Sequence, residues 1–217
     1  MISKTLSTAC VATFAMASVS MGAILAPGSS SLTPGTDAMT SPHAYGSLVH
    51  SQLDSFDIFN SSGALLYQGQ LESFVFQNAL GELTFDLAII GSEAGLNGVI
   101  GEVARSGFAG WVTDVDWRAD APGMKSPDSA SRSTGGDKLF WSGPWSGTAG
   151  IFSGESSRMM FASTDATAFQ ANAGLARITL TTGEFIDIEV AAPVPAPGAL
   201  ALIGLAGCVG TRRRRRC

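Results

Sequence analysis

RITLTTGEFIDIEV, residues 177–190, indicates most plainly what kind of fold this chain adopts. Apolar and polar residues alternate through 177–180 and again through 185–190. A period of two residues is typical of strands that have one buried face. Residues 181–184, Thr-Thr-Gly-Glu, separate the two runs, and a short link containing glycine predicts an antiparallel hairpin.

The same signature recurs along most of the chain. Leu83, Phe85, Leu87 and Ile89 alternate with polar neighbours, so one face of this run is expected to be buried and the other wet. The expected strands are residues 47–59, 65–77, 83–89, 99–103, 107–117, 139–142, 158–162, 177–180 and 185–190. With turns every 8 to 12 residues or so, they predict an all-β fold, an antiparallel β-sandwich of about eight to ten strands.

Two segments lack this alternation. Residues 27–42, PGSSSLTPGTDAMTSP, are polar and rich in Pro and Gly, so residues 23–43 are expected to form a linker. Residues 119–137 carry Pro, Gly, Ser and Asp and are expected to form a long surface loop. The sandwich ectodomain is therefore assigned to residues 44–191.

The first 22 residues have the composition of a secretory signal peptide. Lys4 is their one charge, an apolar run covers 6–19, and small residues surround Gly22 and Ala23, where cleavage is expected. The apolar run is too short to cross a hydrocarbon core of about 30 Å as a retained helical anchor. Export by the Sec route and cleavage by signal peptidase are therefore predicted, with residues 1–22 as the signal helix.

The C-terminal residues 192–217 fall into three parts. Pro193, Pro195 and Pro197 deny the backbone N–H groups that a helix needs, so a helix can begin only after them. Residues 199–209, ALALIGLAGCV, can form an apolar helix that barely crosses a bilayer. A membrane-stop run follows, made of Arg212, Arg213, Arg214, Arg215 and Arg216. Positive charge resists translocation, so this tail is expected to be a marginal membrane anchor.

This tail resembles the PEP-CTERM sorting signal of secreted proteins from exopolysaccharide-producing Gram-negative bacteria. Val194, Pro195, Ala196 and Pro197 stand where the family usually has Val-Pro-Glu-Pro, and the apolar stretch and the arginines follow in the family's order. Ala196 replaces the usual acidic residue. The resemblance implies processing by an exosortase, a membrane-embedded cysteine protease. An uncut C-terminal membrane span is the alternative.

Charge and cysteine usage restrict the exported part further. Six of the 13 basic residues lie in the two end segments, which leaves 7 basic against 18 acidic residues and a formal net charge of −11. Such acidity argues against nucleic acid as a partner. All three cysteines also lie in the end segments, so the domain must be stabilised by its core and not by disulfides.

Catalytic signatures are weak in this sequence. His43 and His50 are the two histidines, and no G-x-S-x-G motif surrounds any serine. The two histidines have no third zinc ligand at a recognisable spacing, so a zinc site is not predicted. A hydrolase of surface polymers remains only as an alternative, with Asp114 and Asp116 as its carboxylates.

Asp114, Asp116 and Asp120 are the candidate calcium ligands. Alternation places Asp114 and Asp116 on one face of a strand, and hard carboxylate oxygens suit Ca²⁺. The alternative is that these two aspartates form the wet face of the strand. No cofactor is otherwise expected.

Trp145 is the candidate glycan contact. Four tryptophans lie between residues 111 and 145, and aromatic faces stack on sugar rings. Glycine and proline flank Trp145, so it is expected to be exposed, whereas Trp111 and Trp117 are expected to pack in the core.

These observations favour a non-enzymatic envelope or extracellular-matrix protein. Its expected partners are signal peptidase and an exosortase-like protease, with transient attachment to the inner membrane before it reaches the cell surface or the medium. The alternative is a carbohydrate-binding module that tethers extracellular polysaccharide.

Overall fold

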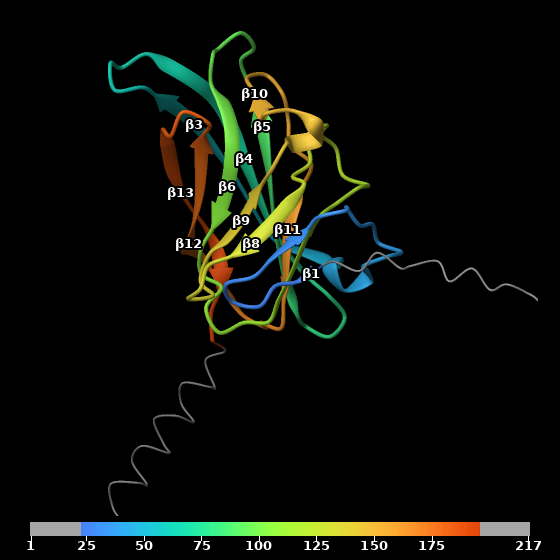
Figure 1. The fold of residues 1–217 in the computed structure, drawn as a ribbon. Coiled ribbons are helices and arrows are strands. Elements are labelled where there is room, and N and C mark those ends of the chain that lie inside the picture. The colour runs from blue at the N-terminus through green and yellow to red at the C-terminus, as the bar shows by residue number, and fades with distance from the viewer. Residues whose placement is uncertain (1–22, 196–217) are drawn as a thin grey trace, which may run out of the picture.

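The computed structural model describes residues 23–195, in which thirteen strands form two antiparallel sheets packed face to face (Figure 1). The strands are β1 (Ala23–Ile24), β2 (Ser30–Leu32), β3 (Ser47–Phe59), β4 (Leu65–Gln77), β5 (Leu83–Gly91), β6 (Val99–Arg105), β7 (Thr113–Trp117), β8 (Ser129–Arg132), β9 (Leu139–Ser142), β10 (Ile151–Phe152), β11 (Met160–Thr164), β12 (Phe169–Leu180) and β13 (Phe185–Pro193). Sheet A has the order β1-β7-β11-β5-β4-β3. Sheet B has the order β13-β12-β6-β9-β8-β2, and β10 pairs with β6.

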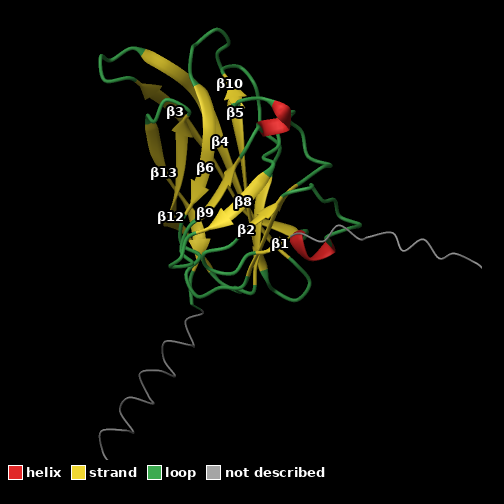
Figure 2. Ribbon diagram, viewed as in Figure 1, coloured by secondary structure: helices red, strands yellow, loops and turns green. Residues whose placement is uncertain are grey.

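The predicted all-β architecture is confirmed. Strands β3, β4 and β9 have the bounds expected from the sequence, and β12 and β13 form the predicted hairpin. Gly183 turns this hairpin at a φ of +103°, a conformation that favours glycine, and the N–H of Leu180 donates to the carbonyl of Glu184 at 2.8 Å. Within the described residues, the helical elements are two single 3-10 turns, η1 (Pro42–Ala44) and η2 (Trp145–Gly147), red in Figure 2.

The strands beyond the expected eight to ten are short ones. β1, β2, β8 and β10 have two to four residues each, too few to display an alternating pattern. Two of them correct the assignment of residues 23–43 as a linker, because β1 pairs with β7 and β2 pairs with β8. β8 also lies inside the expected surface loop 119–137.

The inward faces of the two sheets form one apolar core. Leu71, Phe85 and Val115 from sheet A and Trp141 and Ile178 from sheet B are all fully buried. Burial of such side chains contributes roughly 1.5–3 kcal/mol each. The core therefore provides the stabilisation expected of a domain without cysteine.

An arginine lies inside this core. Arg105 is fully buried, with its guanidinium 5.3 Å from the ring centroid of Phe85 and 6.0 Å from that of Phe108. It donates to the carbonyl oxygens of Asp86 (3.2 Å) and Ala191 (2.6 Å), so it joins one sheet to the other. Burial lowers the pKa of Arg105 to about 9, and the Asp86 carboxylate opposes this change.

Residues 33–45 cover part of the outer face of sheet A. Arg118 pairs with Asp86 at 2.5 Å, donates to the carbonyl of Ala44 at 2.8 Å and lies 4.0 Å from the ring centroid of Tyr45. The expected wet face of β5 is therefore buried: Asp86 is 0% exposed. Burial raises the pKa of Asp86 to about 7, and the positive charge of Arg118 opposes this rise.

A third arginine joins the loops at one end of the sandwich. Arg132 is buried and donates from Nε to the carbonyl of Gly136 (2.9 Å) and from Nη1 to that of Leu25 (2.9 Å). Its Nη2 donates to the carbonyls of Phe108 (2.7 Å) and Trp111 (2.9 Å). Segments far apart in sequence thus share one guanidinium group, and this set of contacts is called the Arg132 clamp below.

The predicted signal helix and apolar tail helix lie outside the described residues. Among residues 23–195, no helix has the length and apolar character that a bilayer crossing requires.

Candidate functional site

A groove crosses the outer face of sheet B, where β13, β12, β6 and β9 are neighbours (Figure 1). Residues paired directly across neighbouring strands project from the same face. One such row across the four strands consists of Asp187, Arg177, Ala104 and Phe140. Ala104 has only a methyl group between the longer side chains of Arg177 and Phe140, so the row is hollow at its centre. The groove encloses about 370 Å³, within the usual range for small-molecule sites of about 300–1,000 Å³.

The wall of the groove on β12 and β13 is a fixed polar and aromatic group. Arg177 donates from Nε and Nη2 to the two carboxylate oxygens of Asp187, both at 2.7 Å. The same guanidinium lies 4.0 Å from the ring centroid of Phe185. Phe185 is nevertheless 52% exposed, and Leu175, on the other side of Arg177 along β12, is 44% exposed. The groove thus presents apolar surface that solvent reaches.

The next row of the sheet adds a carboxylate. Phe185 faces Thr179, and Thr179 faces Glu102 on β6. Burial raises the pKa of the Glu102 carboxyl, and no hydrogen-bond donor among the described residues offsets that rise. Lys138 also lines the groove. Apart from Arg105, whose guanidinium is buried in the core, the groove therefore has two carboxylates against one guanidinium and one ammonium, and their formal charges balance.

This groove was not among the sites predicted from the sequence. One feature of the sequence could have indicated it. The alternation in residues 185–190 places Phe185, a large apolar residue, on the face of the strand that is exposed to solvent. The contribution of Ala104 and Phe140 depends on strand neighbours 35 or more residues away, and the sequence does not reveal that pairing.

A second hollow, of about 510 Å³, lies against sheet A beside β7 and β11. His43 and Asp114 meet there, with Nε2 and Oδ2 2.7 Å apart. Ser163 also lines the hollow, but its hydroxyl accepts a hydrogen bond from Thr84 at 3.1 Å. A nucleophilic serine needs a hydrogen bond to its base. Among the described residues His43 has no such contact with Ser163, so a catalytic triad is not assembled.

The three candidate calcium ligands each have a separate partner. Asp114 contacts His43, and Asp120 accepts a hydrogen bond from the hydroxyl of Tyr45 at 2.7 Å. Asp116 accepts from the backbone N–H groups of Gly35 and Trp117, both at 2.9 Å. Across residues 23–195, no group of three or more acidic, histidine or cysteine side chains has the arrangement of a metal site.

The alternative interpretation of these aspartates as a wet face is wrong. Asp114 is 8% exposed and Asp116 is 0% exposed, because residues 33–45 cover this side of β7. Burial raises the pKa of Asp116 to about 6, while the N–H groups of Trp117 and Gly35 oppose the rise.

Trp145 is buried, contrary to its expected exposure. Its side chain is 0% exposed, and the indole N–H donates to the carbonyl of Gly101 at 2.9 Å. The flanking Gly and Pro bend the chain so that the ring enters the core instead of solvent. A glycan contact at Trp145 therefore has no accessible surface. Trp111 and Trp117, expected in the core, are only half-buried.

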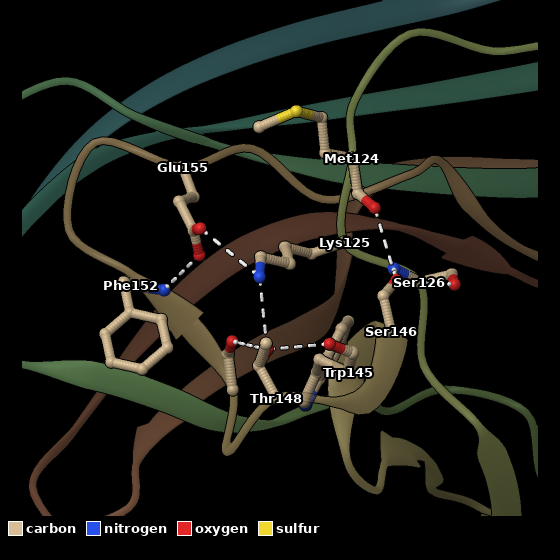
Figure 3. A network of polar contacts seen from close by, with 9 residues as sticks. Met124, Lys125, Ser126, Trp145, Ser146, Thr148, Phe152 and Glu155 are labelled. Carbon is tan, nitrogen blue, oxygen red and sulfur yellow. Dashed lines mark hydrogen bonds and ion pairs between the residues drawn. The ribbon is translucent and has the colours of Figure 1, made fainter.

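Polar contacts hold the loops around Trp145 in place (Figure 3). Lys125 pairs with Glu155 at 3.2 Å and donates to the hydroxyl of Thr148 at 3.1 Å. The Thr148 hydroxyl donates in turn to the carbonyl of Trp145 at 2.8 Å. Ser146, at a φ of +52°, accepts a hydrogen bond from the N–H of Ser126 at 2.9 Å. These groups satisfy one another and have structural roles.

The predicted processing residues lie at the borders of the described chain. Val194 donates its N–H to the carbonyl of Ala168 at 3.0 Å, and Pro195 is exposed. At the other border, the backbone of Ala23 pairs with Val115. Gly22, Ala196, Pro197 and Arg212–Arg216 lie outside the described residues.

Comparison with known proteins identifies no relative: no family model, curated protein or solved structure matches this chain.

Proposed function

We propose that this chain is an exported, surface-sorted and non-enzymatic protein of the bacterial envelope or extracellular matrix. In this proposal, signal peptidase removes the N-terminal segment, and an exosortase-like protease processes the Val194–Pro197 segment. The inner membrane holds the protein only between these two steps.

The observation that carries the proposal is where the folded domain lies between the two targeting segments. The first described residue, Ala23, already belongs to β1, and the last strand, β13, ends at Pro193. Val194 is tied to Ala168, and Pro195 beside it is exposed. Both expected cleavage regions are thus directly next to the domain. Cleavage after Gly22 and within residues 194–197 would leave all thirteen strands intact.

The engagement of the polar groups supports a structural role. Asp116 and Asp120 are occupied by backbone and tyrosine contacts, and the Ser163 hydroxyl is bonded to Thr84. These two carboxylates and this hydroxyl thus hold residues 33–45 and the strands of sheet A together.

Intact mass of the protein from the surface and medium fractions of its native host tests the proposal. The expected mass lacks the residues before about Ala23 and also lacks the arginine run. A variant with residues 194–197 scrambled is expected to keep its tail and to remain in the membrane fraction.

A second variant serves as the control. Residues 181–184, in the β12–β13 hairpin loop, can be scrambled with Gly183 retained, which changes a loop of equal length away from the tail. This variant is expected to be processed normally. Persistence of the arginines on the native protein would contradict the sorting proposal and would indicate an uncut membrane-anchored domain.

A further inference from the structure

We propose that the groove on the outer face of sheet B binds a neutral polysaccharide, with Phe185 and Phe140 as its stacking surfaces. The site is distinct from the buried Trp145, and its existence does not depend on how the chain is sorted.

The apolar surfaces of the groove fit the C–H faces of sugar rings. Phe185 is half-exposed, and its ring is held by the guanidinium of Arg177 at 4.0 Å. Phe140 lies across the groove, with the small Ala104 between them on the floor. Aromatic rings fixed in this way supply large contact area at little cost in conformational entropy.

The polar groups fit sugar hydroxyls, which both donate and accept. Glu102 provides a half-buried carboxylate that is free to accept. Arg177 uses Nε and Nη2 on Asp187, so its Nη1 group can donate to a ligand. A carboxylate and a guanidinium are planar groups with two acceptor or donor atoms, which suits pairs of adjacent hydroxyls.

Charge favours a neutral ligand over a polyanion. Glu102, Asp187, Arg177 and Lys138 line the groove, and their formal charges sum to zero. Arg105 also lines the groove, but its guanidinium is buried in the core and donates to the carbonyl of Asp86. The exported part as a whole carries a formal charge of −11, with 7 basic and 18 acidic residues. An acidic polysaccharide or a nucleic acid would approach against this field.

The position of the groove favours a polymer over a single sugar. It lies on the outer face of a sheet and not inside the sandwich, so a polymer longer than the groove can extend over the neighbouring surface. A polymer engages many copies of the protein at once, which compensates for a modest affinity at each site.

Native gel electrophoresis of the full chain in gels that contain laminarin, dextran or hydroxyethyl cellulose tests this proposal. At least one of these neutral glucans is expected to retard the protein. Phe185→Ala is expected to weaken the affinity by about tenfold or more, the usual loss when a central aromatic contact is removed. Ala104→Trp is expected to abolish binding, because it fills the floor of the groove.

Phe152→Ala is the matched control, because Phe152 is also an exposed phenylalanine (43%) but lies on β10, outside the groove. It is expected to leave retardation unchanged. Unaltered thermal unfolding confirms that each variant is folded, and Phe185→Ala at an exposed position provides a test even if Ala104→Trp fails to fold.

Three results would overturn the proposal. The first is no retardation by any of the three neutral glucans. The second is retardation that Phe185→Ala and Ala104→Trp leave unchanged, which places binding elsewhere. The third is stronger retardation by alginate that disappears at high salt and that Phe185→Ala weakens, which indicates a polyanion site in the groove and not binding by Arg212–Arg216.

Discussion

Replacement of Arg132 by lysine removes the clamp while keeping the positive charge. The guanidinium of Arg132 donates to four backbone carbonyls, those of Gly136, Leu25, Phe108 and Trp111. The lysine ammonium carries its three protons on one nitrogen, so it cannot reach acceptors that lie on several sides of a planar fork. The variant is therefore expected to lose contacts that hold the N-terminal segment and the β6–β7 loop to the sandwich.

The structure gives the size of the effect. Arg132 is 6% exposed, so carbonyls that lose it have little water to replace it. A hydrogen bond that involves a charged group contributes about 1.5–3 kcal/mol. Loss of two of the four predicts a decrease of about 3–6 kcal/mol in the free energy of unfolding. A domain of this kind is stable by about 5–15 kcal/mol, so the variant is expected to fold but with a small margin.

Urea unfolding followed by tryptophan fluorescence measures this decrease. With a denaturant slope of about 2 kcal/mol/M, the midpoint is expected to fall by about 1.5–3 M. Arg177→Lys is the matched control, because it makes the same replacement at an exposed ion pair on sheet B. If Arg132→Lys lowers the midpoint no more than Arg177→Lys does, the Arg132 clamp does not stabilise the domain.

Three further predictions concern residues whose surroundings differ from those expected from the sequence. Gly35→Ala should release residues 33–45 to proteolysis, because Gly35 has a φ of +85° and an added Cβ would lie 2.3 Å from the Trp117 ring; Gly63→Ala, at a φ of +82° in open space, controls for backbone strain alone. Asp116→Asn should flatten part of the pH dependence of unfolding. The pKa of Asp116 in the folded protein, about 6, lies above its ordinary value of 3.8. Protonated Asp116 therefore adds to the free energy of unfolding below about pH 4, and this stabilisation is lost as the pH rises through 6. The unfolding free energy of the variant minus that of the wild type should therefore grow between pH 4 and pH 7, by up to about 3 kcal/mol. An equal difference at both pH values would contradict a raised pKa of Asp116. Trp145→Ala should cost about 3–5 kcal/mol in unfolding free energy, measured in urea, and a loss below 1 kcal/mol would show that the ring is not packed in the core.

The long strands could be predicted because their information is local. In residues 177–190 the alternation and the intervening glycine are both contained within fourteen positions, and the hairpin has the expected form. Short strands such as β1 and β2 could not be found in this way. They are strands only because β7 and β8 supply their hydrogen-bond partners about 90 or more residues later.

The candidate sites differ for the same reason. Alternation places Asp114 and Asp116 on one face of a strand, and they do share it. Alternation does not reveal whether another segment covers that face, and residues 33–45 bury it. The prediction that Trp145 is exposed was wrong for a similar reason. The flanking Gly and Pro indicate that the chain turns, but they do not indicate whether the ring then points into the core or into solvent.

The sequence by itself determined the fold class, the acidic and cysteine-free composition of the domain, and the phase of each long strand, because all of these depend on composition or on neighbours within a few positions. Only the tertiary structure decided which faces are covered, that Arg132 and Arg105 join distant segments, and that Ala104 leaves a groove between Arg177 and Phe140. Those features depend on which strands become neighbours, and that choice is made by the packing of the whole core.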